Sequence, residues 1–112
     1  MTTFDDREQA FEAKFAHDEE LRFKARARCN NLLGLWAAQL QGLKGSDAVG
    51  YAATVVSADL QGPGHEEVLR KIAADLSSAA NAPQGSDLTM EAIRSKMADF
   101  LVQAQEDLLE EV

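Results

Sequence analysis

Apolar residues recur every three or four positions along most of the chain, which is the spacing of one face of an α-helix. Stretches that contain Gly, Pro or both separate these periodic segments and are typical of loops. The pattern is clearest in the C-terminal half, at Val68, Leu69, Ile72, Ala73 and Leu76, and then at Met90, Ile93, Met97, Phe100, Leu101, Ala104 and Leu108. It predicts four helices, over about 18–41, 47–60, 65–80 and 88–110.

The composition agrees with an all-helical chain. Ala, Leu, Glu, Asp and Gln are abundant, whereas the β-branched and aromatic residues that strands prefer are few, with 6% of the residues aromatic. A length of 112 residues fits one domain. Four helices joined by short loops predict an all-α fold, an antiparallel four-helix bundle, over residues 18–112.

Two helices are expected to supply much of the core. The apolar face of the first is predicted to be Leu21, Ala25, Cys29, Leu32, Trp36 and Leu40. Gly42 and Gly45 follow it as stop signals. In the second helix, Ser46 or Asp47 is the expected cap. Its apolar residues cover much of the circumference, which predicts a well-buried helix: Ala48, Tyr51, Ala52, Val55 and Val56.

The first seventeen residues show a different pattern. On a helical wheel, Phe4, Phe11 and Phe15 fall within about 40° of one another and form a narrow aromatic stripe. Asp18 and Arg22 interrupt the stripe before the apolar face of the next helix begins. A helix this short is marginal in water, because nucleation is costly. We therefore expect residues 1–17 to be a flexible segment that becomes helical on binding. Charged residues flank the stripe: Asp5, Asp6, Arg7, Glu8, Glu12 and Lys14.

Two interpretations of the aromatic stripe remain open at this point. The three phenylalanines could fold back on the bundle as ordinary core, or a partner could bury them in a helix-in-groove contact. Full burial of three Phe side chains would contribute roughly 5 to 9 kcal/mol before the cost of ordering the segment is subtracted. A third interpretation, a mere disordered terminus, is weakened because such tails are poor in aromatic residues. Burial by a partner is the working hypothesis, and folding back on the bundle remains the alternative.

The charge of the chain limits its partners. A formal net charge of -8 argues against binding to nucleic acid or to an anionic membrane surface. The exception is a basic cluster, in which Arg22, Lys24, Arg26 and Arg28 place four bases and no acid between residues 22 and 28. The simpler interpretation is a solvated helix face paired with its own carboxylates, by Asp18 to Arg22 and Glu20 to Lys24. The alternative is a docking patch.

Motifs for catalysis or metal binding are missing from the sequence. Cys29 is the only cysteine, so it cannot form an intrachain disulfide, and we expect it to be buried and inert. His17 and His65 have no ligand spacing for zinc and no Glu three residues before them, as a di-iron bundle requires. No nucleophile with its base, and no phosphate loop, can be identified. The expectation is a protein that is not an enzyme, has no metal site, and is intracellular and soluble.

One long run of residues resembles a known family. The run from Phe4 to Ala25 reads FDDREQAFEAKFAHDEELRFKA, and Asn30 to Ala38 reads NNLLGLWAA. These stretches are similar to the zeta subunit, the natural inhibitor of the alphaproteobacterial F-type ATP synthase. The similarity continues more sparsely through Tyr51-Ala52, Val55 to Asp59, Arg70-Lys71 and Ile93 to Met97.

The resemblance implies a function. It implies an inhibitor of ATP hydrolysis whose N-terminal segment forms a helix at the interface of the alpha, beta and gamma subunits and blocks rotation. The protein would be cytoplasmic, a monomer when free, and peripherally associated with the inner membrane through the synthase. No cofactor is required, although weak ATP or ADP binding is associated with the family. The implied partner-binding residues all lie in this segment and are Phe4, Asp5, Asp6, Arg7, Glu8, Phe11, Lys14, Phe15, His17 and Asp18.

Two other functions remain as alternatives. The bundle could be a regulator that binds a small molecule, such as a nucleotide, between its helices. It could also be an adaptor for another protein partner.

Overall fold

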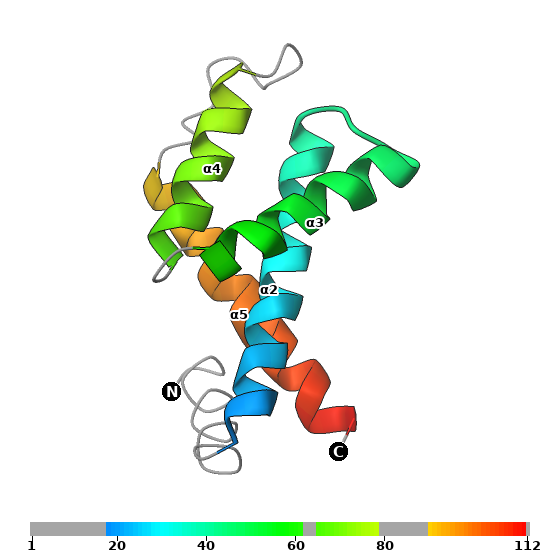
Figure 1. Ribbon diagram of the computed structural model, residues 1–112, viewed down its shortest axis with the longest axis vertical. Coiled ribbons are helices and arrows are strands. Elements are labelled where there is room, and N and C mark those ends of the chain that lie inside the picture. The colour runs from blue at the N-terminus through cyan, green and yellow to red at the C-terminus, as the bar shows by residue number, and fades with distance from the viewer. Residues whose placement is uncertain (1–17, 62–64, 79–89, 112) are drawn as a thin grey trace.

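The computed structural model describes residues 18–61, 65–78 and 90–111. In these ranges the chain forms four helices and no strand (Figure 1). The helices are α2 (Glu19–Leu40), α3 (Gly45–Gln61), α4 (His65–Ser78) and α5 (Met90–Glu111). The prediction of an all-α fold with four helices is confirmed over the described ranges. The flexible segment at 1–17 lies outside them, so that prediction stays untested.

Helices α2 and α5 run in opposite directions. On α2 and α5, Lys96 lies over the Trp36 ring while Glu111 pairs with Arg28, so later residues of one helix meet earlier residues of the other. Helices α2 and α3 are also antiparallel, because Arg26 pairs with Asp59 while Gly34 lies against Ala52. Helices α3 and α4 follow the same antiparallel order. Figure 1 shows α2 and α5 side by side, with α3 and α4 packed obliquely at one end of this pair.

Helix α2 is the centre of the fold because it packs against both α3 and α5. Its buried face is therefore broader than a single stripe, and consists of Ala25, Cys29, Asn30, Leu33, Gly34, Ala37 and Ala38. The predicted apolar face is part of this surface. Ala25 and Cys29 are buried, and the half-buried Leu21, Trp36 and Leu40 pack against the core clusters.

The crossing of α2 and α3 depends on a glycine. A Cβ at Gly34 would lie 2.7 Å from the Cα of Ala52 and 3.2 Å from the Cβ of Val55. Real Cβ atoms do not approach backbone atoms this closely, so only glycine allows the two helices their present separation. The residues opposite Gly34 are small or β-branched, which gives a close-packed contact.

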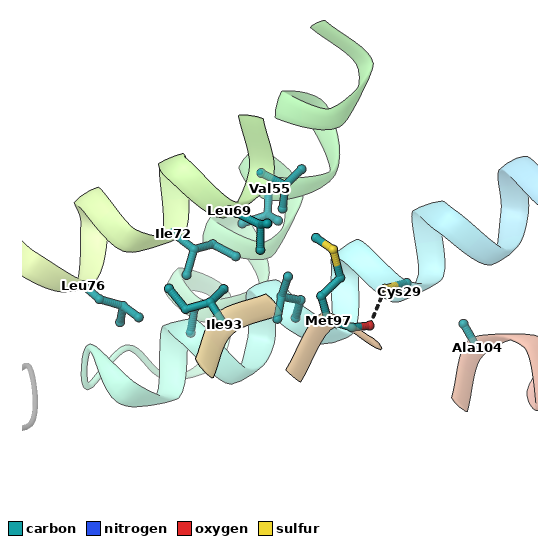
Figure 2. Close-up of a cluster of buried hydrophobic side chains, with 11 residues drawn as sticks. Cys29, Val55, Leu69, Ile72, Leu76, Ile93, Met97 and Ala104 are labelled. Carbon is teal, nitrogen blue, oxygen red and sulfur yellow. Dashed lines mark hydrogen bonds between the residues drawn. The ribbon is translucent and has the colours of Figure 1, made fainter. Parts of the chain in front are cut away.

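The main hydrophobic core lies between α2, α3, α4 and α5. Figure 2 shows Val55, Leu69, Ile72, Ile93 and Met97 gathered around a common centre. A second, smaller cluster lies further along α2 and α5 and consists of the buried Ala25 and Leu108 with the half-buried Leu21 and Leu109. The helices thus enclose one large core and one small one.

Helix α3 is less buried than the sequence pattern predicts. Ala52 and Val55 are fully buried, but Tyr51 and Val56 are half-buried and Val49 is 63% exposed. The prediction of a well-buried helix was wrong, because α2 and α4 cover one side of α3 and leave the other side in contact with solvent.

The turn between α2 and α3 follows the predicted glycines. Gly42 has a φ of 82° and the amide of Leu43 donates to the carbonyl of Ala38, so α2 ends in a Schellman-type turn. Gly45 has a φ of 56° and begins α3 two residues earlier than the sequence analysis expects. Asp47 consequently lies in the first turn of α3 and is not its cap.

Candidate functional site

Most of the predicted site residues lie outside the described residues. They are Phe4, Asp5, Asp6, Arg7, Glu8, Phe11, Lys14, Phe15 and His17. Their roles stay predictions. Asp18 is the one predicted site residue that the structure describes, and it lies where the segment joins the bundle.

Asp18 is the N-cap of α2. Its φ of -103° and ψ of 93° are extended, and its Oδ1 accepts a hydrogen bond of 3.1 Å from the amide of Leu21. This bond satisfies one of the amides that a helix leaves without an internal partner at its start. Glu19 and Glu20 occupy the first turn, where the helix dipole favours negative charge. Three acidic residues in a row thus fix the beginning of α2.

Three residues of the basic cluster are paired within the chain. Arg26 bonds Asp59 of α3 at 2.6 Å, Arg28 bonds Glu111 of α5 at 2.7 Å, and Lys24 lies 3.8 Å from Glu20. The predicted pair of Glu20 with Lys24 within α2 is confirmed. The alternative interpretation as a docking patch stays a prediction. Arg26 and Arg28 join α2 to its two neighbours.

The ion pair between Arg28 and Glu111 shifts the pKa of both groups. The hydrogen bond from Arg28 to Glu111 is the main cause that lowers the pKa of the Glu111 carboxyl below its ordinary value. The same bond raises the pKa of Arg28. Asp107, 3.9 Å from Arg28, is a second carboxylate on the same side. The C-terminal end of α5 is therefore bound to α2 by an ion pair as well as by the apolar packing of Leu108.

A shallow groove lies beside this pair, with a volume of about 670 Å³. Phe23, which is 54% exposed, forms part of its wall. The sequence analysis did not single out Phe23, although an aromatic residue within a run of charged ones was a usable signal. The groove combines apolar surface with one ion pair, so it could accept an apolar side chain. Its lining residues are Leu21, Phe23, Lys24, Ala27, Arg28, Asn31, Val56, Leu108 and Glu111.

A polar network joins α3 to α4 and was also not predicted. The Tyr51 hydroxyl donates to Asp75 at 2.8 Å, and the Lys71 ammonium donates to the same carboxylate at 2.9 Å. Lys71 also lies 5.0 Å from the centre of the Tyr51 ring. Burial and the Asp75 carboxylate raise the pKa of Tyr51, so the phenol stays protonated and donates. The network acts as a clamp between two helices.

Cys29 is 2% exposed, and its thiol donates to the carbonyl of Met97 at 3.5 Å (Figure 2). Burial raises the pKa of this thiol to about 12. The thiolate is the reactive form of cysteine, so the buried thiol is unreactive at neutral pH. The predictions that Cys29 is buried and inert agree with this environment.

The described residues contain no group of three or more His, Cys, Asp or Glu that could hold a metal ion. Within the same ranges, none of the helices has the length and hydrophobicity of a membrane span. The expectations about cofactors and catalysis stay predictions. What the described side chains provide is a stable helical body with an exposed groove and a firmly capped start of α2.

Comparison with known protein families gives one match that covers nearly the whole chain. A family model described as ATPase inhibitor subunit zeta matches residues 1–107. The matched range contains all ten predicted partner-binding residues. Comparison with curated proteins gives no match.

Proposed function

Since the chain belongs to the ATPase inhibitor subunit zeta family, we propose that it inhibits ATP hydrolysis by inserting its N-terminal segment, as a helix, into the F-type ATP synthase. The segment would enter at the catalytic interface of the alpha, beta and gamma subunits and block rotation in the direction of hydrolysis. An inhibitor subunit regulates a reaction and does not catalyse one, in keeping with a sequence that carries no catalytic motif.

The observation that carries this proposal is the extent of the family match. It begins at residue 1, so it includes the aromatic stripe of Phe4, Phe11 and Phe15 together with the helical body. The main core is formed among side chains of α2, α3, α4 and α5. A helix that carries an aromatic stripe is suited to helix-in-groove binding.

The energetics of the proposal are reasonable. Burial of three Phe side chains in a partner contributes roughly 5 to 9 kcal/mol, from which the cost of ordering the segment is subtracted. Aromatic side chains alone would therefore give modest affinity. The charged residues beside the stripe would supply orientation and additional contacts: Asp5, Asp6, Arg7, Glu8, Lys14 and His17.

The location follows from the partner. The synthase is a membrane enzyme, and its alpha, beta and gamma subunits form the catalytic sector outside the bilayer. A protein that binds this sector would be cytoplasmic and peripherally attached to the inner membrane, with no insertion of its own. No cofactor is needed for such a steric mechanism.

The proposal is tested with a variant in which Phe4, Phe11 and Phe15 are all replaced by Ala. Inhibition of ATP hydrolysis by purified synthase is measured against protein concentration, and thermal unfolding is recorded in parallel. We expect the concentration for half-maximal inhibition to rise by at least tenfold, because the apolar contacts are lost.

Val49→Ala is the control, since Val49 is an exposed apolar residue of α3 that does not line the groove. It should inhibit much more strongly than the triple variant. Equal inhibition by the wild type and the triple variant, or no inhibition by the wild-type protein, would contradict the proposal.

A further inference from the structure

An exposed aromatic side chain and an exposed cation line the same groove between α2, α3 and α5. Phe23 is 54% exposed, and the side chain of Lys24 is 57% exposed. Exposed apolar surface that is gathered in a hollow and rimmed by polar groups is typical of an interaction site. The other apolar residues of the lining are Leu21, Ala27, Val56 and Leu108. The groove can therefore receive a large apolar side chain of a partner.

The two cations of the groove differ in how firmly they are paired. Arg28 lies 2.7 Å from Glu111, a distance typical of a charge-assisted hydrogen bond. Lys24 lies 3.8 Å from Glu20, which is too long for such a bond, and both side chains are more than half exposed. Lys24 can therefore exchange this weak intrahelical pair for a carboxylate of a partner.

The groove differs in sign from the chain as a whole. Its lining contains two cations, Lys24 and Arg28, and one carboxylate, Glu111, whereas the whole chain carries a net charge of -8. A positive lining favours an acidic partner segment at this place and disfavours a basic one. A second copy of this acidic chain would be repelled at long range, so charge favours a different protein as the occupant.

We propose that this groove is a second docking site for the synthase, occupied by an acidic segment that presents a large apolar side chain beside a carboxylate. The apolar side chain packs against Phe23, and the carboxylate pairs with Lys24. This inference rests on the proposed function and adds a contact of the helical body to that of the inhibitory segment. Two linked contacts bind more tightly than either one alone, because the second forms within the complex.

Substitutions in the groove test the docking through the concentration of full-length protein that half inhibits ATP hydrolysis by purified synthase. Phe23→Ser should raise this concentration by about 5- to 30-fold, as expected for an aromatic anchor. Lys24→Glu should raise it by about 2- to 10-fold, because a like charge then faces the carboxylate of the partner. Val49→Ser is the matched control, since Val49 is an exposed apolar residue outside the groove. Thermal unfolding of each variant is recorded in parallel.

Photo-cross-linking identifies the occupant without relying on inhibition. The photoreactive amino acid p-benzoylphenylalanine replaces Phe23 in the full chain, and the protein is irradiated together with purified synthase. We expect a cross-link to a synthase subunit, at a peptide that contains Asp or Glu beside a large apolar residue. The same photoreactive amino acid in place of Val49 should give no such cross-link.

The outcomes distinguish this inference from the proposed function. If the wild type inhibits, but Phe23→Ser or Lys24→Glu inhibits equally well, the docking site is wrong while the function stands. A cross-link from position 23 to a second copy of the chain, to residues 1–17, or to a peptide without Asp or Glu would also overturn it. If the wild type does not inhibit, the proposed function fails. In that case the presence of the cross-link to the synthase supports the docking site, and its absence refutes it.

Discussion

The two ends of the α2 and α5 pair are held together in different ways. At one end α3 and α4 cover the pair, and residues such as Leu33, Ile72 and Ile93 are fully buried in the large core (Figure 1). At the other end, the small cluster of Ala25 and Leu108 is supported by ion pairs on the surface. Buried apolar area contributes most to stability, whereas exposed ion pairs contribute little.

This difference matters because the weaker end is the one that carries Asp18, where the predicted inhibitory segment ends and α2 begins. The stronger end can maintain the fold while residues near the junction adjust to a partner. Local stability in proteins varies in this way, and binding regions are commonly drawn from its lower range. The comparison leads to three predictions, in order of decreasing effect.

The largest effect is expected from truncating a leucine in the large core. Leu33→Ala should lower the free energy of unfolding by about 2 to 5 kcal/mol, because it leaves a cavity among rigid neighbours. Leu108→Ala, in the small cluster, should cost about 2 kcal/mol or less, since the end of the pair can relax around it. Urea unfolding of both variants measures the difference. Equal losses would show that the two ends are equally well packed.

A smaller effect is expected where α2 crosses α3. Gly34→Ala should destabilise the protein by about 1 to 3 kcal/mol, because the new methyl group meets the backbone of Ala52. Gly50→Ala is the matched control on α3, where a Cβ meets nothing within 4 Å. It should stabilise the protein by about 0.5 to 1 kcal/mol, since alanine is the better helix former. A neutral Gly34→Ala would refute the close crossing.

The smallest effect is expected at the pair of Arg28 with Glu111. The pKa of Glu111 is lowered in the fold, so its contribution is present above the pKa of the unfolded chain and is lost as pH falls through the folded value. An NMR titration should place the pKa of Glu111 below 4.5, its reference value, and Arg28→Gln should raise it. The thermal midpoint of Arg28→Gln should change less than that of Gly34→Ala. An unshifted Glu111 would contradict the pairing.

The sequence predicted the number and type of helices because periodicity and glycine stops are local signals. Gly42 ends α2 as expected, and Glu20 pairs with Lys24. The apolar spacing also predicted the buried faces of α4 and α5, where Leu69, Ile72, Ile93 and Met97 are buried. It did not predict the full buried face of α2. A helical wheel counts Asn30 as polar and places it outside the core, yet Asn30 is 1% exposed, because α2 has neighbours on two sides. The burial of such a residue depends on how the helices pack together and cannot be predicted from the sequence of one helix.

The candidate site in residues 1–17 stays a prediction. The aromatic stripe follows from the spacing of three residues, and the family match includes it. The exposure of Phe23 and the clamp of Tyr51, Lys71 and Asp75 required coordinates, because they depend on pairs of helices. A spacing pattern within one segment can reveal a binding helix. It does not reveal the surface that surrounds its attachment point.

The central claim is that residues 18–111 form the stable body and that the residues before them inhibit the synthase. Deletion of residues 2–16 tests both parts in one protein, through the rate of ATP hydrolysis by purified synthase and the thermal midpoint of the deleted chain. We predict that inhibition is abolished while the thermal midpoint stays close to that of the full chain. Undiminished inhibition by the deleted chain, or a body that no longer folds, would contradict the account.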